Sequence, residues 1–328
     1  MKILFIGGTG NISVSVSKLA VERGFDLYLL NRGQSGITID GTKSVTADIK
    51  QPAQVEAVLE GQYFDAVVNW IAFTEADIER DLALFSGKCG QYIFISSASA
   101  YQKPVTYPII TESTPLANPW WQYSRNKIAC EERLMRAYRE DGFPMTIVRP
   151  SHTYDTIIPT SVGAGRSYVI PQRMLDGKPV IVHGDGTSLW ALTHCADFAL
   201  GFVGLLGHPQ SIGQSFQITS DFLINWNQIY EQMGEALGVK PNIVHIPSDF
   251  IYDYDANIGA GIVGDKMWSV IFDNTKIKTF VPEYAATIPF HMGIRRTLSW
   301  FQADPARLQV PPEDHALIDN LLNAYQNR

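Results

Sequence analysis

Cysteine is scarce in this sequence, and the few cysteines lie far apart. Cys89, Cys130 and Cys195 are the only three in 328 residues, and none belongs to a C-x-x-C pair or a Cys/His ligand pattern. The seven histidines form no H-E-x-x-H pattern. We therefore expect reduced thiols, a cytoplasmic protein and no metal site.

Long apolar runs and an excess of positive charge are also lacking. No run of about 18 apolar residues is present to span a bilayer, and the first apolar run, residues 3–6, is too short for an export signal. The chain has 26 Lys and Arg against 33 Asp and Glu, a net charge of -7 at pH 7. We expect no membrane attachment, and nucleic acid is a poor partner for such an acidic chain.

The first half of the chain alternates short apolar runs with helical patterns. This alternation is typical of a parallel sheet covered by helices on both faces, and the expected fold is α/β, a doubly wound Rossmann sheet. Between the strands, a helix over 123–140 should bury one apolar stripe. The expected strands cover 2–6, 26–31, 44–47, 66–70, 91–96 and 145–149.

After Pro150 the sequence becomes richer in Gly and Pro punctuation. We expect a Rossmann dinucleotide-binding domain over 1–150. Residues 151–328 are expected to form mainly a smaller α/β substrate-binding lobe, with some segments returning to the first domain. Helical patterns are expected over 196–206, 225–237 and 289–301.

A glycine-rich turn follows the first expected strand and precedes a helix. The stretch Gly7-Gly8-Thr9-Gly10-Asn11-Ile12-Ser13 stands where a Rossmann turn holds a pyrophosphate. Gly7 permits the tight turn, and Gly10 allows the backbone to approach the phosphates at a helix N-terminus. We predict a dinucleotide site that includes Gly7, Gly10, Asn11 and Ile12.

The end of the second strand bears on the choice between NAD and NADP. An acidic residue would be expected there to bind the 2′-hydroxyl of NAD, but the sequence has Asn31-Arg32-Gly33. Arg32 can pair with a 2′-phosphate, which slightly favours NADP over NAD; alternatively it is a solvated surface arginine. After the third strand, Asp48, beside Ile49, either contacts the adenine or caps the next helix.

Three side chains suggest acid–base chemistry. Tyr123 and Lys127 are four residues apart, so they share one face of the expected helix. A nearby ammonium lowers the pKa of a phenol, which would let Tyr123 exchange a proton. Ser97 lies at the end of a strand, where parallel sheets bind ligands, and is a candidate for a hydrogen bond to the substrate. Each of these features alone has a structural explanation, namely a half-buried tyrosine or a turn of serines.

Together these motifs resemble the extended short-chain dehydrogenase/reductase superfamily, in its NAD-dependent epimerase/dehydratase branch of nucleotide-sugar enzymes. The similarity also includes Val148-Arg149-Pro150 with Tyr154, and the stretch from Gly184 through His194 to Asp197. The resemblance implies that Ser97, Tyr123 and Lys127 are catalytic. It further implies that Asn31, Asp48, Ile49, Lys127 and Pro150 help to bind the cofactor.

Two departures from this family concern the substrate. The dehydratases carry an Asp-Glu pair where this chain has Ala98-Ser99, so dehydration is expected to be disfavoured. Trp190 stands where sugar-nucleotide enzymes usually have an arginine, which leaves Arg166 or Arg173 to contact any phosphate. We expect a sugar or sugar-nucleotide-like substrate, contacted by Ser99, His152 and Trp190, although His152 and Trp268 also suit structural roles.

The sequence is also compatible with two non-catalytic functions. The first residues also resemble chloroplast stem-loop RNA-binding relatives, so a non-catalytic RNA-binding protein on the same fold is an alternative, and an NADP(H)-binding redox sensor is another. The resemblance finally implies a homodimer, formed through the segment near 75–85 and the Tyr123 helix.

Overall fold

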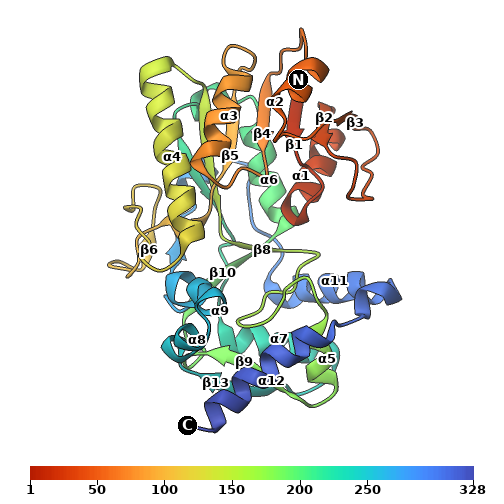
Figure 1. Cartoon of the computed structure of the whole chain (residues 1–328), viewed down its shortest axis with the longest axis vertical. Helices are drawn as coiled ribbons and strands as arrows, with labels where there is room; N and C mark the ends of the chain where they lie inside the picture. The colour runs from red at the N-terminus through yellow and green to blue at the C-terminus, as the bar shows by residue number, and fades with distance from the viewer.

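The computed structural model describes residues 1–328, and a seven-stranded sheet dominates its upper half (Figure 1). All six neighbouring strand pairs are parallel, in the order β11-β7-β5-β4-β1-β2-β3. The chain order reverses next to β1, as in a Rossmann fold, which confirms the predicted doubly wound sheet. The strands are β1 (Lys2–Ile6), β2 (Asp26–Asn31), β3 (Lys43–Thr46), β4 (Ala66–Asn69), β5 (Tyr92–Ile95), β7 (Met145–Pro150) and β11 (Ser215–Ile218).

Helices cover both faces of this sheet. On one face, α1 (Asn11–Glu22) and α6 (Cys195–Leu205) bury Val16 and Phe202 in a shared core with the sheet. On the other, α2 (Pro52–Val58), α3 (Glu75–Phe85) and α4 (Gln122–Asp141) bury residues such as Ile78 and Leu134. Every residue of β4 and β5 is buried, which explains why these strands are apolar in sequence apart from Asn69, whose side chain donates a hydrogen bond to Asp81.

The lower half of Figure 1 holds a smaller α/β lobe with its own hydrophobic core, which includes Trp190 and Trp226. Its strands form three small sheets. The first consists of β8 (His152–Tyr154), β10 (Leu189–His194) and β12 (Leu223–Asn225). The second pairs β9 (Pro179–His183) with β13 (Asn242–Ile246), and the third pairs β6 (Ile109–Ile110) with β14 (Ile271–Phe272). Its helices are α5 (Val169–Leu175), α7 (Trp226–Leu237), α8 (Ser248–Tyr254), α9 (Ala256–Gly261), α11 (Phe290–Gln302) and α12 (Pro312–Gln326).

Segments from the second half of the chain also join the large sheet. Strand β11 pairs with β7 at its edge, and α6 and α10 (Thr275–Phe280) belong to the packing of the upper half. The helices expected over 196–206, 225–237 and 289–301 correspond to α6, α7 and α11 within one residue at each end. None of the helices has the length and apolar character that a membrane span requires.

Candidate active site

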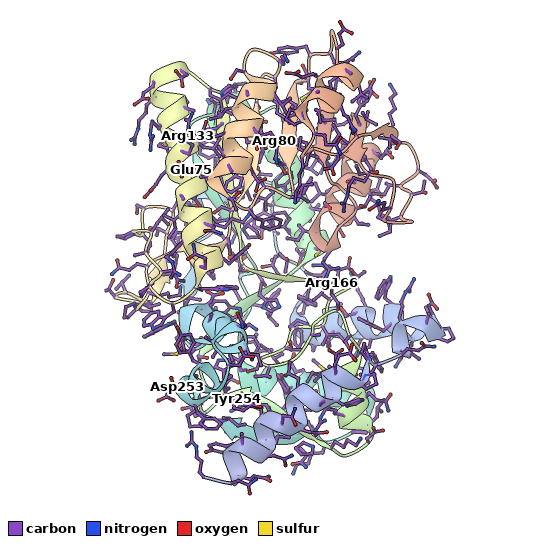
Figure 2. The ribbon with its side chains drawn as sticks, in the orientation of Figure 1. Glu75, Arg80, Arg133, Arg166, Asp253 and Tyr254 are labelled. Carbon is purple, nitrogen blue, oxygen red and sulfur yellow. The ribbon has the colours of Figure 1, made fainter.

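A cleft of about 730 Å³ opens at the carboxyl ends of β1, β4, β5 and β7. In doubly wound sheets, ligands bind at this edge. The upper half contributes the glycine turn, Ser97, Tyr123 and Lys127, and the lower lobe contributes His152 and Trp190. The lower lobe also contributes Arg166, which Figure 2 shows where the two halves meet. The structure therefore brings most of the predicted site residues together in one cavity.

The glycine turn has the geometry that a dinucleotide requires. Gly7 and Gly8 adopt φ values of +96° and +91°, which L side chains rarely adopt. A Cβ on Gly8 would lie 2.7 Å from a Leu29 side-chain carbon, so the turn packs closely on β2. Gly10 caps α1 without a side chain, leaving the first N–H groups of the helix open to an anion. These residues fit the diphosphate of NAD or NADP.

The structure places the other residues that were predicted to bind the diphosphate or the nicotinamide end in different ways. Ile12, after the glycine turn, and Pro150, at the end of β7, both line the cleft. The Asn11 side chain instead connects the two halves of the molecule: its amide nitrogen donates to Thr153 O (3.3 Å), and its oxygen accepts from Thr156 N (3.1 Å). A contact between Asn11 and a dinucleotide would therefore involve its backbone rather than its side chain.

The residues predicted for the adenosine end lie at the carboxyl ends of β2 and β3, beside β1. Asn31 accepts a hydrogen bond from Gly33 N (2.8 Å), and the Arg32 side chain is exposed. Asp48 accepts from Lys50 N (3.0 Å). The alternative that Asp48 caps the next helix is wrong, because α2 begins at Pro52 with Gln51 as its N-cap. The Ile49 side chain is buried in the core, which leaves only its backbone for contact with a ligand.

Ser97 is held by a chain of hydroxyl groups. It caps the short 3₁₀ turn η1 (Ala98–Ala100) and accepts a hydrogen bond from Ser99 N (3.2 Å). Its Oγ lies 2.9 Å from Ser99 Oγ, which in turn accepts from Ser124 Oγ (2.8 Å). Ser99 lines the cleft but is only 2% exposed. The hydroxyl of Ser99 thus orients Ser97, and its predicted role in substrate binding stays a prediction.

The effect of Lys127 on the pKa of Tyr123 stays a prediction, because burial dominates the pKa of both groups in the protein without a ligand. Lys127 Nζ donates to the carbonyl oxygens of Ala72 and Ile95 (both 2.7 Å) and lies 5.7 Å from the centre of the Tyr123 ring. Burial raises the pKa of Tyr123 to about 12, and the neighbouring Ser97 hydroxyl only partly opposes this rise. Burial also lowers the pKa of Lys127 to about 8. Burial is therefore the largest influence on the pKa values of both Tyr123 and Lys127.

The residues considered for substrate contact differ in accessibility. His152 lines the cleft, and burial lowers its pKa to about 3, so its imidazole is neutral. Trp190 lines the cleft and its indole N–H has no partner. Arg173 cannot compensate for a missing phosphate ligand, because it is buried between Pro179 O (2.8 Å) and Asp319 (2.7 Å). Trp268 donates to Val263 O (2.7 Å) and has a structural role.

Sequence reasoning missed several cleft residues of the two lobes. Trp70 and Trp121 line the upper side, and Asp265 and Lys266 line the lower side. Trp70 directly follows β4, the same strand-end position that identified Ser97, so this signal was available. No motif marks Asp265 or Lys266, which lie on a π-helical turn, η3 (Ile262–Lys266).

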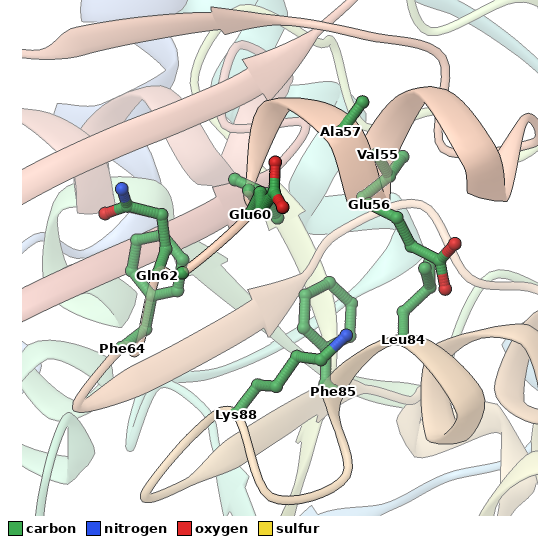
Figure 3. Close-up of a pocket in the computed structure, with 11 residues that line it drawn as sticks. Val55, Glu56, Ala57, Glu60, Gln62, Phe64, Leu84, Phe85 and Lys88 are labelled. Carbon is green, nitrogen blue, oxygen red and sulfur yellow. The ribbon is translucent and has the colours of Figure 1, made fainter.

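A second cavity of about 550 Å³ lies away from this cleft, beside α2 and the end of α3 (Figure 3). Apolar side chains such as Val55 and Phe85 line it together with Glu56, Glu60 and Lys88. None of the predicted catalytic or cofactor-binding residues contributes to it, and no strand of the sheet ends in it with a glycine turn. The cleft that contains Tyr123 is therefore the candidate active site.

Two curated proteins are similar to this chain in sequence. The chain is 23% identical over 287 residues to 2'-dehydrokanamycin reductase of Streptomyces kanamyceticus, covering 87% of this chain and 80% of the relative. It is 26% identical over 265 residues to the chloroplast stem-loop binding protein of 41 kDa b of Arabidopsis thaliana, covering 76% and 67%.

Solved structures share the fold at low sequence identity. A UDP-glucose 4-epimerase of Thermotoga maritima has a TM-score of 0.74 at 20% identity, over 92% of this chain and 99% of that one. A dTDP-glucose 4,6-dehydratase of Streptomyces venezuelae has a TM-score of 0.74 at 17% identity, over 93% and 98%. The sequence model of the NAD dependent epimerase/dehydratase family matches residues 3–219. The chain belongs to the NAD dependent epimerase/dehydratase family.

Proposed function

We propose that the protein is an NAD(P)-dependent oxidoreductase or epimerase that acts on a sugar or sugar-nucleotide-like substrate. One observation carries this proposal: Ser97, Tyr123 and Lys127 line the same cleft as the glycine turn. A dinucleotide held at α1 and a substrate oxygen held at Tyr123 would share one cavity. This is the arrangement that hydride transfer with coupled proton transfer requires.

Different residues of the cleft are assigned to cofactor binding and to proton transfer. The open N–H groups at the start of α1 would hold the diphosphate of a bound dinucleotide, and Lys127 would hold its nicotinamide ribose. When bound, the nicotinamide supplies or accepts the hydride. Ser97 donates a hydrogen bond to the reacting substrate oxygen, and Tyr123 exchanges a proton with it.

The pKa of Tyr123 favours one direction of proton transfer. Because burial raises this pKa to about 12, the phenol keeps its proton at neutral pH. In a reduction, hydride adds to the carbonyl carbon and Tyr123 gives its proton to the oxygen. The protonated phenol is the form that carbonyl reduction needs, and one relative of this chain is named 2'-dehydrokanamycin reductase.

The residues at positions 98 and 99 bear on whether the enzyme eliminates water from its substrate. The absence of carboxyl groups at Ala98 and Ser99 favours reduction or epimerisation over loss of water. The comparisons do not support this narrower expectation, because dehydratases are among the proteins that share the fold. The proposal is therefore the broader one of hydride transfer on a sugar-like substrate.

The choice of cofactor and reaction can be tested on the purified protein. Mass spectrometry identifies any dinucleotide that is released on denaturation, and titration with NADPH and NADH measures the two affinities. Exposed Arg32 supports a preference for NADP(H), which Arg32→Ala should remove. An empty site that prefers NADPH indicates a reductase, and retained NAD indicates an epimerase. If neither dinucleotide binds, the proposal fails.

A non-catalytic nucleic-acid-binding role is the second candidate, since the chain is also similar to a chloroplast stem-loop binding protein. The net charge of -7 weighs against it. Retention of stem-loop RNA at low salt, lost steeply as salt rises, would favour this alternative over the enzyme.

A further inference from the structure

Asp265 projects from the lower lobe into the cleft without a hydrogen-bond partner. It lines the same cavity as Ser97 and Tyr123, and its side chain is 14% exposed. Its Oδ1 is buried, accepts no hydrogen bond and lies 3.9 Å from Lys103 Nζ, and Oδ2 accepts no hydrogen bond either. A largely buried carboxylate without a hydrogen-bond donor is unfavourable. Because Lys103 lies beside Oδ1, Oδ2 is the oxygen to which a ligand in the cleft can donate.

The backbone around Asp265 is fixed from both halves of the molecule. Asp265 lies on η3, and π-helical turns are rare and frequently occur at functional sites. Asn118 Nδ2 donates to Gly264 O (2.7 Å) and also to Ser99 O (3.0 Å). One side chain therefore ties the turn that carries Asp265 to the turn that carries Ser97. This link sets the position of the carboxylate relative to the catalytic residues.

The next residue fixes the turn from below. Lys266 O accepts hydrogen bonds from Ser188 Oγ (3.1 Å) and Trp226 Nε1 (3.2 Å). Lys266 Nζ donates to Thr160 O (2.9 Å) and Ser161 O (3.2 Å). The Lys266 ammonium is thus engaged by backbone carbonyls and leaves the Asp265 carboxylate free of a direct ion pair on that side.

Lys103 is the nearest cation to Asp265. Its Nζ lies 3.9 Å from Asp265 Oδ1, and its side chain is 2% exposed. Lys103 does not line the cleft, so it stands behind the carboxylate rather than between it and a ligand. Burial raises the pKa of Asp265 to about 6 against the opposing charges of Lys103 and Lys266. Asp265 is therefore mostly ionised at neutral pH, and can accept hydrogen bonds from a ligand.

We propose that Asp265 is a substrate-recognition residue whose carboxylate accepts a hydrogen bond from a hydroxyl or ammonium group of the substrate while Tyr123 faces the reacting oxygen. This inference rests on the proposed function and adds one requirement for its substrate: a hydroxyl or ammonium donor near the reacting carbon. Trp190, which offers no charge to a diphosphate, supports the same small, donor-rich substrate.

Binding of simple ring compounds to the dinucleotide-loaded protein tests this proposal. The probes are glucose, glucosamine and a fully O-methylated glucoside, which has the ring but no donor. At pH 7.5, Asp265→Asn should weaken binding of glucose or glucosamine about 10-fold or more, and leave the methylated glucoside unaffected. Tighter binding of glucosamine than of glucose identifies an ammonium donor, and similar binding identifies a hydroxyl. Asp253→Asn, at an exposed residue of α8, is the matched control (Figure 2).

A second variant guards against a folding defect. Asp265→Asn leaves Lys103 buried without its partner, so Lys103→Met/Asp265→Asn removes both charges, and it should bind the probes as weakly as the single variant. Equal binding by wild type and both variants, or no binding of glucose and glucosamine to the wild type, overturns the proposal. Dinucleotide affinity, measured on the same samples, separates this failure from failure of the proposed function.

Discussion

Tyr123 and Lys127 lie one helical turn apart on α4. Burial raises the pKa of Tyr123 and lowers the pKa of Lys127. The phenol becomes a weaker acid and the ammonium a stronger one, with pKa values of about 12 and about 8. Both shifts favour the uncharged forms, as desolvation requires. Lys127 therefore loses its charge within the pH range in which enzymes are commonly assayed.

The pH dependence of turnover should follow Lys127. Below pH about 8 its ammonium is charged and can hold the nicotinamide ribose, so we expect activity to fall as the pH rises through that value. A pH–rate profile measures this basic limb. Since burial also lowers the pKa of Lys266 to about 8, Lys266→Met is the control and should keep the limb. Activity that rises up to pH 10 would contradict the assignment.

Single residues were predictable where a local pattern marks them. Ser97 follows a strand, and Tyr123 and Lys127 share a helix face; these patterns, together with the glycine turn and the family resemblance, predicted all three as site residues, and all three line the cleft. The pKa of Tyr123 was not predictable, because burial depends on residues far away in the sequence. Asp265 has no motif at all and reaches the cleft only through the packing of the lower lobe.

Elements of the large sheet were easier to predict than those of the lower lobe. The buried strands β4 and β5 are short apolar runs, except for Asn69 at the end of β4, and their length and β-branched or aromatic residues favour a strand over a helix. Strands β8 and β12 have only three residues each, and β11 pairs with β7 from a distant part of the sequence. Helix α12 was missed as well. Such elements depend on tertiary contacts rather than on local periodicity.

The N-terminus of α1 offers a direct test of dinucleotide binding. A Cβ on Gly10 would meet only Ser13 Oγ, at 3.5 Å, and Asp is a favourable N-cap, so Gly10→Asp should fold normally. Its carboxylate would repel the diphosphate and weaken NADPH binding at least 10-fold more than neutral Gly10→Asn does. Fluorescence titration measures both affinities. Equal affinities for the two variants would argue against a diphosphate at this position.

A buried ion pair anchors α4 beneath the cleft. Arg149 at the end of β7 donates to Glu131 through Nε (3.0 Å) and Nη2 (2.5 Å), and both side chains are almost fully buried. Glu131→Gln should lower the free energy of unfolding by about 3–5 kcal/mol, because it leaves the arginine charge unpaired. Urea denaturation measures this loss. Glu132→Gln, at an exposed position on the same helix, should change stability by less than about 0.5 kcal/mol.

At the scale of the whole molecule, the two halves meet around the cleft through side chains rather than through one continuous sheet. Asn11 joins the glycine turn to residues 153–156, and Asn118 joins the Ser99 turn to η3. The substrate would thus touch groups from both halves. The Gly and Pro punctuation after Pro150 predicted a smaller lobe, but only the packed structure shows which of its residues line the cleft with Tyr123.

The outer surfaces of α3 and α4 are the predicted dimer interface. These helices pack against each other (Figure 1) and are joined by the Arg133–Glu79 ion pair. Two such pairs would make a four-helix bundle between subunits. Light scattering should therefore give twice the chain mass of 36.5 kDa. A single species at the mass of one chain would contradict this prediction.

Transfer of deuterium from NADPH labelled at C4 to a sugar-like carbonyl compound tests the central claim most directly. In the wild type, mass spectrometry should find one deuterium on the reduced carbon per turnover. Tyr123→Phe should slow this transfer by about 10²–10⁴-fold while leaving NADPH affinity unchanged, because only the proton donor is lost. Equal transfer rates in the two proteins would show that the chemistry does not depend on Tyr123.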